Sequence, residues 1–398
     1  MAFFANDAIN RVNLHYAVQA LASNLGGVFF FAYLLHAGIS VPVTLLAFVS
    51  MVAGRFVLRP LIIPLGKRWG LKPLVIVGAL LHAVQYPILA WVHGVGWPLV
   101  IYCAVGCPAS ALYWPTFHAY FAALGDAEHR GQQTTAREAV AAVIGIVAPL
   151  VGGWGLMTTG PLVIFGAAAL VQAASALPLI GAPNVTPPLS APGAYRAARQ
   201  ATAMFMADGW LGAGINYVWQ VALFVSVGSN IAAYGGAVAL AALVGALLGM
   251  LLGRHVDTGH GRRAVVIAYA TTAVLVLVQA LSYGSPWLAV GANALLSVVG
   301  NLIVAAMWTA TYNLAQASPC PLRFNFATEG AWDIGCGGGV LAAAAISALG
   351  GSLSVSILLS LFGAAASVWL LWRYYGAHPG AGGIEVDPAL AAETHAPP

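Results

Sequence analysis

The stretch GRHVDTGHGRRAVV, residues 253–266, places a short charged segment between two long apolar runs. Residues 231–253 before it and 264–283 after it contain no Asp, Glu, Lys or Arg. Each run reaches the length of about 20 apolar residues that a helix needs to cross the hydrocarbon core of a bilayer. The stretch therefore indicates a short loop that joins two membrane-spanning helices.

The same alternation of apolar runs and short charged loops continues along the whole chain. Its 398 residues are 61% hydrophobic and only 7% charged, and the mean hydropathy is +0.87, which is too apolar for a soluble protein. We expect an integral membrane protein in contact with the lipid bilayer. The predicted spans are 12–36, 41–65, 73–93, 97–124, 134–157, 160–181, 202–228, 231–253, 264–283, 286–314, 325–349 and 353–375.

A Pro-rich stretch after the sixth span divides the chain into two halves. We expect an N-terminal six-helix bundle, a cytoplasmic linker, a C-terminal six-helix bundle and a disordered, Gly/Pro-rich cytoplasmic tail. Their predicted bounds are 1–182, 183–200, 201–376 and 377–398.

Basic residues occur in alternate loops, and the loops between those contain no Lys or Arg. By the positive-inside rule this asymmetry predicts cytoplasmic termini and an even number of spans. The net charge of +4 then reflects membrane topology, and no nucleic-acid partner is expected. The basic positions are Lys67, Arg68, Lys72, Arg130, Arg196, Arg199, Arg254, Arg262, Arg263, Arg323 and Arg373.

Neither a cofactor nor a metal site is indicated. The four cysteines show no spacing typical of disulfides or zinc ligands. The chain contains no GxxxxGK[ST] phosphate-binding loop, which argues against an ATP-driven pump. The N-terminal segment lacks the pattern of a cleaved signal peptide, so we expect the first span to be retained.

The two halves show internal similarity. YWPTFHAY and MWTATYNL align Trp114 with Trp308, and REAVAAVIG and TEGAWDIG align Glu138 with Glu329. This similarity predicts pseudo-symmetric halves derived by duplication.

The loop quoted first also carries a family resemblance. Its residues Gly253, Asp257, Gly261, Arg262 and Arg263 resemble the cytoplasmic loop signature of the major facilitator superfamily, with one extra residue between Asp257 and Gly261. The equivalent loop of the first half keeps its basic residues but has glycine in place of the acid. In addition, APLVGG at 148–153 is similar to an element of antiporters in this superfamily.

The resemblance implies an all-α membrane protein with twelve transmembrane helices in two six-helix bundles. It implies a carrier that rocks between inward-open and outward-open states, with a substrate cavity lined by spans 1, 4, 7 and 10. It also implies that span 2 packs on span 11 and span 5 on span 8. We expect a monomer in a bacterial-type inner membrane.

Charged residues within the spans are costly to bury and are therefore candidates for function. Counted at 1.5 Å per residue, Asp333 lies about 15 Å and Glu329 about 9 Å beyond Arg323, at the cytoplasmic side of span 11. Arg55 and Arg59 lie at matching depths in span 2. We predict that Arg55 pairs with Asp333 and Arg59 with Glu329, as a gate between the two halves. A static structural cluster, or arginines that bind an anionic substrate, are the alternatives.

Proton coupling needs a titratable group in the membrane that is not permanently paired. Asp208 in span 7 has no basic partner on its own helix, and His15 takes the equivalent place in span 1. Asp333 and Glu329 are further coupling candidates. Glu138, near the cytoplasmic end of span 5, is predicted to pair with Arg254 of span 8.

Polar and aromatic residues on the four predicted lining spans are candidates for the substrate cavity. They are Asn24, Tyr113, Trp114, His118, Asn216, Gln220, Asn301, Trp308 and Tyr312.

The predicted function is secondary active transport of a small solute, coupled to protons, with antiport favoured over symport. Uptake of a transition metal or metal chelate, or of an organic anion bound by Arg55 and Arg59, are alternatives. More distant alternatives are a membrane-embedded enzyme and a non-transporting receptor on the same fold; we expect no enzyme.

Overall fold

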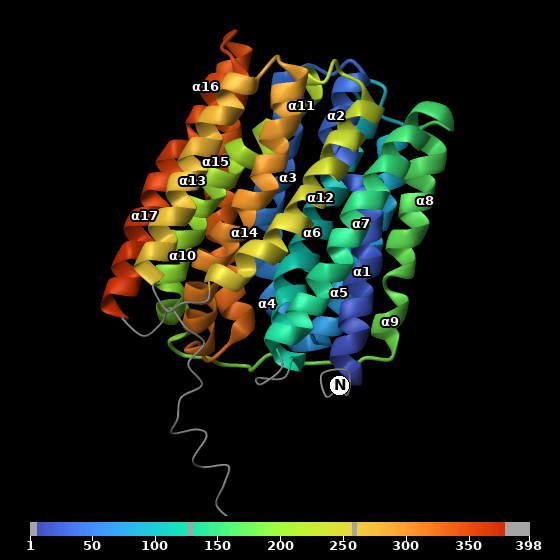
Figure 1. Cartoon of the computed structure of the whole chain (residues 1–398). Helices are drawn as coiled ribbons and strands as arrows, with labels where there is room; N and C mark the ends of the chain where they lie inside the picture. The colour runs from blue at the N-terminus through green and yellow to red at the C-terminus, as the bar shows by residue number, and fades with distance from the viewer. Residues whose placement is uncertain (1–5, 126–129, 257–260, 379–398) are drawn as a thin grey trace, which may run out of the picture.

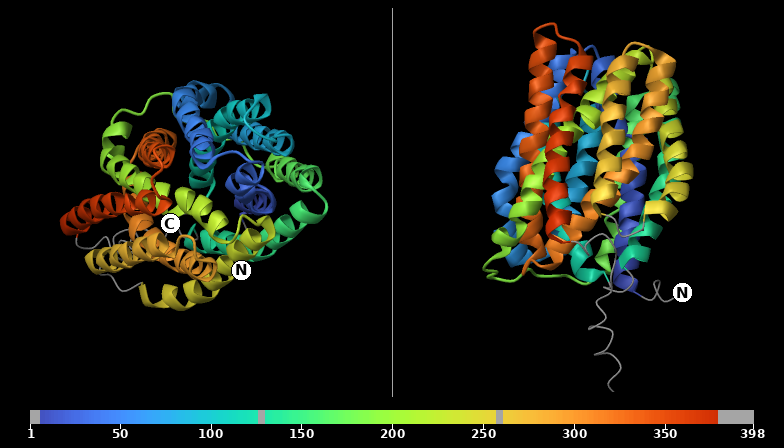
Figure 2. Two further views of the ribbon diagram at one scale, coloured as in Figure 1. Left: turned by 90° about the horizontal axis from the view of Figure 1, so that it is seen from above. Right: turned by 60° about the vertical axis from the view of Figure 1, so that its left-hand side comes forward.

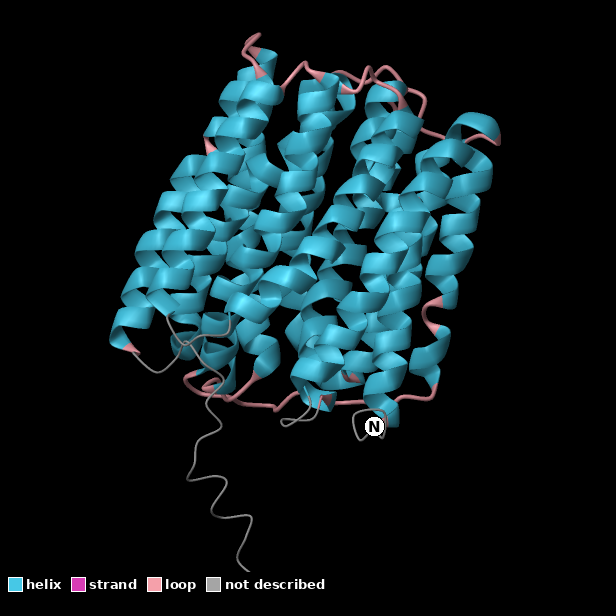
Figure 3. Ribbon diagram, in the orientation of Figure 1, coloured by secondary structure: helices cyan, strands magenta, loops and turns pink. Residues whose placement is uncertain are grey.

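The structure of the chain, a computed structural model, describes residues 6–125, 130–256 and 261–378. Side chains are described throughout these ranges except at 130–139, 249–256, 301, 304, 305, 308, 309, 312 and 316. In this part of the chain every regular element is a helix and no strand occurs (Figure 3). The prediction of an all-α protein is confirmed.

The helices of the first half follow the predicted apolar runs. Several begin with proline in the first turn, where its missing N–H has no helical partner to lose. One example is Pro161, which follows Gly160, a residue whose φ of 90° favours glycine. The elements are α1 (Asp7–Leu25), the 3₁₀ helix η2 (Gly27–Phe29), α2 (Phe30–His36), α3 (Val41–Leu58), the 3₁₀ helix η3 (Arg59–Leu61), α4 (Ile62–Trp69), α5 (Leu71–Ala90), α6 (Trp97–Leu124), α7 (Arg130–Thr158), α8 (Pro161–Ala174) and α9 (Leu177–Ile180).

The second half begins with a helix that contains a π-helical segment. Its first helix starts at Ala194, inside the segment 183–200 that separates the two halves. The elements are α10 (Ala194–Gly212), the π-helix η4 (Ala213–Val218), α11 (Trp219–Ser226), α12 (Ile231–Val256), α13 (Gly261–Ser282), α14 (Pro286–Gln316), α15 (Pro321–Ala348), α16 (Leu353–Leu358) and α17 (Ser360–Ala377).

Ten helices or continuous helical runs among the described residues are long and apolar enough to cross a membrane. Their apolar surfaces are only partly covered by protein, as expected for helices that face lipid. The two other predicted spans, 202–228 and 286–314, fall on α10–η4–α11 and on α14. The finding agrees with the prediction of an integral membrane protein.

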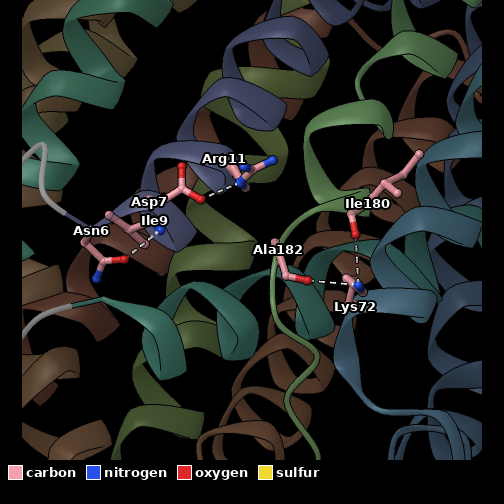
Figure 4. Close-up of polar contacts among 7 residues, drawn as sticks. All are labelled: Asn6, Asp7, Ile9, Arg11, Lys72, Ile180 and Ala182. Atoms are coloured by element: carbon pink, nitrogen blue, oxygen red, sulfur yellow. Dashed lines mark hydrogen bonds and ion pairs between the residues drawn. The ribbon is translucent and has the colours of Figure 1, made fainter.

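The start of α1, the segment between α9 and α10, and the end of α17 all lie at one end of the bundle, which we call the terminal end (Figure 1). Polar contacts hold this end together (Figure 4). Asn6 caps α1 by accepting from Ile9 N at 3.0 Å. Lys72 Nζ donates to the carbonyls of Ile180 and Ala182 at 3.2 and 2.8 Å. A cation is thus placed at the C-terminus of α9, where the helix leaves carbonyls without helical partners.

Several helix pairs connect the halves, and among them α3 packs on α15 and α7 packs on α12. These are the pairs 2–11 and 5–8 that the resemblance implies. Helices α7 and α12 approach each other closely at two glycines. A Cβ added at Gly153 would lie only 3.3 Å from the Cα of Gly235. Figure 2 shows the teal and green helices of the first half opposite the red and orange helices of the second.

Candidate functional site

Three charged side chains meet where α3 packs on α15. Arg55 lies in the last turn of α3, and Arg59 begins the 3₁₀ helix that follows. Both guanidiniums donate through Nη2 to Asp333 of α15, one to each carboxylate oxygen. The exposed fraction of the side chain is 11% for Arg55, 2% for Arg59 and 1% for Asp333. Two charge-assisted hydrogen bonds offset the large cost of burying this carboxylate.

The structure places Arg55 against its predicted partner, but the predicted pairing of Arg59 with Glu329 is wrong. Arg59 binds Asp333 instead. Depth along the axis compares backbone positions, whereas an arginine side chain is long enough to reach a carboxylate about one helical turn (5.4 Å) away. The 3₁₀ segment Arg59–Leu61 adds a small increase in rise. Gly330 also leaves room for the arginine, because a Cβ there would already contact Arg59 Cδ at 3.6 Å.

Glu329 lines a cavity of about 380 Å³ together with Arg55 and Asp208. Asp208, on α10, accepts a hydrogen bond from Trp332 Nε1 at 3.2 Å. Among the described residues neither Glu329 nor Asp208 forms an ion pair. The cavity therefore contains two carboxylates that no described cation neutralises directly.

The cavity lies between the halves. Its walls come from α3 and α6 of the first half and from α10, η4, α14 and α15 of the second. Of the predicted cavity residues, Trp114, His118 and Asn216 line it. Asn216 also lines a second cavity of about 330 Å³, together with Gln220, so the two cavities are adjacent.

Two of the predicted cavity residues lie elsewhere. Tyr113 is fully buried in the core of the first half, and Asn24 donates to the carbonyl of Ala20 on its own helix at 2.9 Å. Neither lines the two cavities described above. Their positions on the predicted lining spans did not settle which face of the helix they occupy.

His15 is also remote from the cavity. It is fully buried, with Nδ1 at 2.7 Å from the carbonyl of Ser175 and Nε2 at 2.9 Å from Tyr113 Oη. The carbonyl only accepts, so Nδ1 carries the proton and a neutral ring accepts from Tyr113. The structure thus places His15 in a satisfied hydrogen-bond network within the first half.

A π-helical segment shapes the wall formed by span 7. The segment Ala213–Val218 follows α10, and its residues Asn216 and Tyr217 face the cavity. Single π-helical turns inside α-helices are frequent at functional sites. Gly212 and Gly214 are a sequence signal for an irregular helix that the predictions above did not use; a Cβ at Gly214 would collide with Ser360.

Aromatic side chains of both halves meet beside the cavity. Tyr217 of η4 stacks on Phe48 of α3 with ring centroids 4.3 Å apart, and it lies 6.3 Å from the ring of Phe31 on α2. Tyr217 also meets the ring of Trp332 edge-on at 6.0 Å. Tyr217 and Trp332 were not predictable as site residues from the sequence, because apolar and aromatic residues are common on every span.

Several predicted residues lie outside the described residues or side chains. The side chains of Glu138 and Arg254 are among them, so their pairing stays a prediction. The helices that carry them, α7 and α12, do pack together. The other predicted residues that lie outside the described residues or side chains are Gly253, Asp257, Asn301, Trp308 and Tyr312.

The described end of the loop signature anchors α13. A Cβ at Gly261 would overlap the ring of Tyr375, so only glycine fits here without a shift. Arg262 lies over the ring of Trp372 at 4.9 Å and donates to the carbonyl of the same residue at 3.3 Å. Arg263 is exposed. These contacts attach the start of α13 to α17.

Comparisons with known proteins agree with this architecture. The family model of the Major Facilitator Superfamily matches residues 12–323. The crystal structure of the human organic anion transporter MFSD10 (TETRAN) superposes with a TM-score of 0.66 at 16% identity, covering 92% of this chain and 99% of that one. An auto-inhibited POT family peptide transporter superposes with a TM-score of 0.61 at 14% identity, covering 92% of this chain and 96% of that one. No curated protein sequence matches the chain.

Because the family model covers more than half of its length, the chain belongs to the Major Facilitator Superfamily. The resemblance seen in the loop at 253–263 is confirmed. The chain is an integral membrane protein of a transporter family.

Proposed function

We propose that the chain is a secondary active transporter that moves a small solute across a bacterial-type inner membrane by alternating access. The observation that carries this proposal is the cavity walled by helices of both halves, with Asp208 and Glu329 in its lining. When the two halves rock against each other, a cavity between them opens to one side of the membrane and then to the other. A transporter needs this property, whereas an enzyme would need a nucleophile or metal set held in fixed geometry.

The proposed topology has twelve spans in two six-helix bundles, residues 1–182 and 201–376, with both termini in the cytoplasm. It is supported by the lysines and arginines of the alternate loops, which the positive-inside rule assigns to the cytoplasm. Lys72, for example, lies at the terminal end, beside α9. The terminal end is then the cytoplasmic end.

The proposed coupling ion is the proton, and Asp208 is the favoured carrier. Its only described polar partner is the indole of Trp332, so it can gain and lose a proton without breaking an ion pair. Glu329 shares this property. Asp333 differs, because protonating it would leave two buried guanidiniums without their counter-ion. We favour antiport, with proton and solute held alternately by the cavity acids.

The cluster of Arg55, Arg59 and Asp333 is proposed as an interdomain gate. It joins α3 of one half to α15 of the other. If the halves move apart at this contact, the two arginines have to separate from Asp333, or the helices that carry them have to move together. Breaking a buried ion pair costs several kcal/mol, roughly 3–5 for removal of one partner. The cluster thereby favours the state in which α3 and α15 are in contact.

Distance measurements between spin labels test the proposal without knowledge of the solute. In a background without native cysteines, one pair would be placed at Val95, between α5 and α6, and Leu349, between α15 and α16, which are 73% and 89% exposed. A second pair would be placed at the terminal end, at Trp69 and Tyr195, both 49% exposed. Alternating access predicts two populated distances for each pair, and one pair shortens as the other lengthens when the pH is changed between 5 and 8.

A matched control pair lies within the first half, at Val95 and Leu162, and its distance should stay constant because each half moves as a body. If both interdomain pairs keep one unchanged distance distribution at every pH, the chain does not alternate and the proposal is wrong.

A further inference from the structure

We propose that the substrate of the cavity is an organic monocation with an aromatic or apolar body. This inference rests on the proposed function, because it assigns a substrate class to the same cavity. It depends on the charges that face the cavity, on the partners those charges already have, and on the aromatic side chains around them.

The described charges at the cavity leave one negative charge in excess. Two arginines and three carboxylates lie in or directly behind its wall: Arg55 and Arg59 against Asp333, Glu329 and Asp208. This count takes only the Asp, Glu, Lys and Arg side chains that the structure describes. An uncompensated charge is costly between membrane helices, so the cavity holds either a proton or a cation.

The arginines are poor anion receptors in this arrangement. Both donate to Asp333, and Arg59 is almost completely buried behind the cavity wall. The guanidinium of Arg55 also lies 5.4 Å from the ring centroid of Trp332, an attractive cation–π position. A bound anion would raise the excess negative charge of the cavity from one to two, and Asp333 already lies against both guanidiniums.

The aromatic lining favours an organic cation over an inorganic ion. Trp332 donates to Asp208 at 3.2 Å, so a ring lies directly beside a carboxylate. Tyr217 and Trp114 line the same cavity. Aromatic faces attract organic cations, while the carboxylates supply the opposite charge. Among the described residues no group of three or more His, Cys, Asp or Glu side chains is arranged to hold a metal ion.

The adjacent cavity provides room for an uncharged part of the same molecule. It contains no Asp, Glu, Lys or Arg, and its polar lining includes Asn293, whose Oδ1 accepts from Trp219 Nε1 at 3.1 Å. Gln220, which also lines this cavity, accepts from Tyr234 Oη at 3.3 Å. Because Asn216 lines both cavities, one elongated solute can place its cation near Asp208 and its neutral end here.

Binding of two ions of equal shape and opposite charge tests the inference. The protein in lipid nanodiscs would be equilibrated with tetraphenylphosphonium or with tetraphenylborate, and empty nanodiscs of the same lipid would give the background. We expect saturable binding of the phosphonium and none of the borate. Asp208→Asn should weaken phosphonium binding at least about tenfold, and Glu329→Gln by a similar factor, because each removes a charge facing the ligand.

Asp7→Asn is the matched control, since it removes an acid that is exposed and pairs only with Arg11 on α1. It should leave phosphonium binding unchanged. Tighter binding of tetraphenylborate than of tetraphenylphosphonium, or equal phosphonium binding by the wild type and both cavity variants, would overturn the inference.

The test is independent of transport because it measures equilibrium binding. If the spin-label distances alternate but the phosphonium does not bind, the substrate class is wrong and the transporter proposal stands. If the phosphonium binds at the acids but the distances never alternate, the binding site stands and transport by alternating access does not.

Discussion

Replacing Asp333 by Asn is expected to destabilise the protein more than any other single change in the charge cluster. Asp333 is 1% exposed and accepts from two guanidiniums, of which Arg59 is only 2% exposed. Removing the shared counter-ion leaves two buried cations, and breaking a buried pair in this way costs about 3–5 kcal/mol. At roughly 2 °C per kcal/mol for a large domain, the apparent melting temperature should fall by about 6–10 °C.

Arg59→Gln should cost less, because it leaves the pair of Arg55 and Asp333 intact. The double variant Arg59→Gln/Asp333→Asn should lose less stability than the two single losses added together, by about 1–3 kcal/mol, since the two residues are in contact. Thermal unfolding in detergent, followed by tryptophan fluorescence, measures all three variants.

Glu329→Gln provides the control for this series. It lines the cavity and has no ion pair with a described residue, so its melting temperature should stay within about 1–2 °C of the wild type, as for changes away from buried pairs. Destabilisation by Glu329→Gln as strong as that by Asp333→Asn, or coupling of Arg59 to Glu329 instead of Asp333 in the double variants, would show that Asp333 is not the shared counter-ion.

Three further predictions address other parts of the structure. Phe48→Ala removes the ring stacked on Tyr217 and should lower the melting temperature by several degrees. It should also increase the access of a labelling reagent to the cavity from the end of the bundle away from the termini; unchanged access would show that the stacked pair does not restrict entry there. Arg323→Gln removes the donor to the carbonyls of residues 188 and 189, so limited proteolysis should cut the segment 183–193 several times faster than in the wild type. His15→Gln should cost about 1–3 kcal/mol of stability through the lost buried hydrogen bonds, while the pH dependence of the spin-label distances stays unchanged; a shifted pH dependence would make this histidine part of the coupling.

The membrane spans were predictable because lipid imposes a simple rule on the sequence. Each span has to be apolar over its length, and charged residues collect in the loops, so the runs of hydropathy mark the helices directly. The starts of helices were less well predicted; α10, for example, begins at Ala194, since Gly193 with a φ of 85° allows the turn to end there. The family could be recognised from the loop at 253–263 because its residues are adjacent in sequence.

The site was predictable only where depth along a helix decides which residues meet. Depth placed Arg55 at the level of Asp333, but the partner of Arg59 depends on the reach of its side chain and on Gly330 in the neighbouring helix. Which face a residue occupies was not predictable for Tyr113, which lies in the core and not in the cavity. The contact of Trp332 with Asp208 depends on how α10 packs on α15, and no local pattern contains this information.

The central claim is that a carboxylate in a cavity between two rocking halves takes up and releases the coupling proton. Currents recorded after a pH jump on proteoliposomes adsorbed to a solid-supported membrane test it most directly, because proton binding inside the membrane moves charge across part of the field. We predict a transient current for the wild type and for Asp7→Asn, and loss of most of that current in Asp208→Asn. A current of wild-type size in Asp208→Asn would contradict the account.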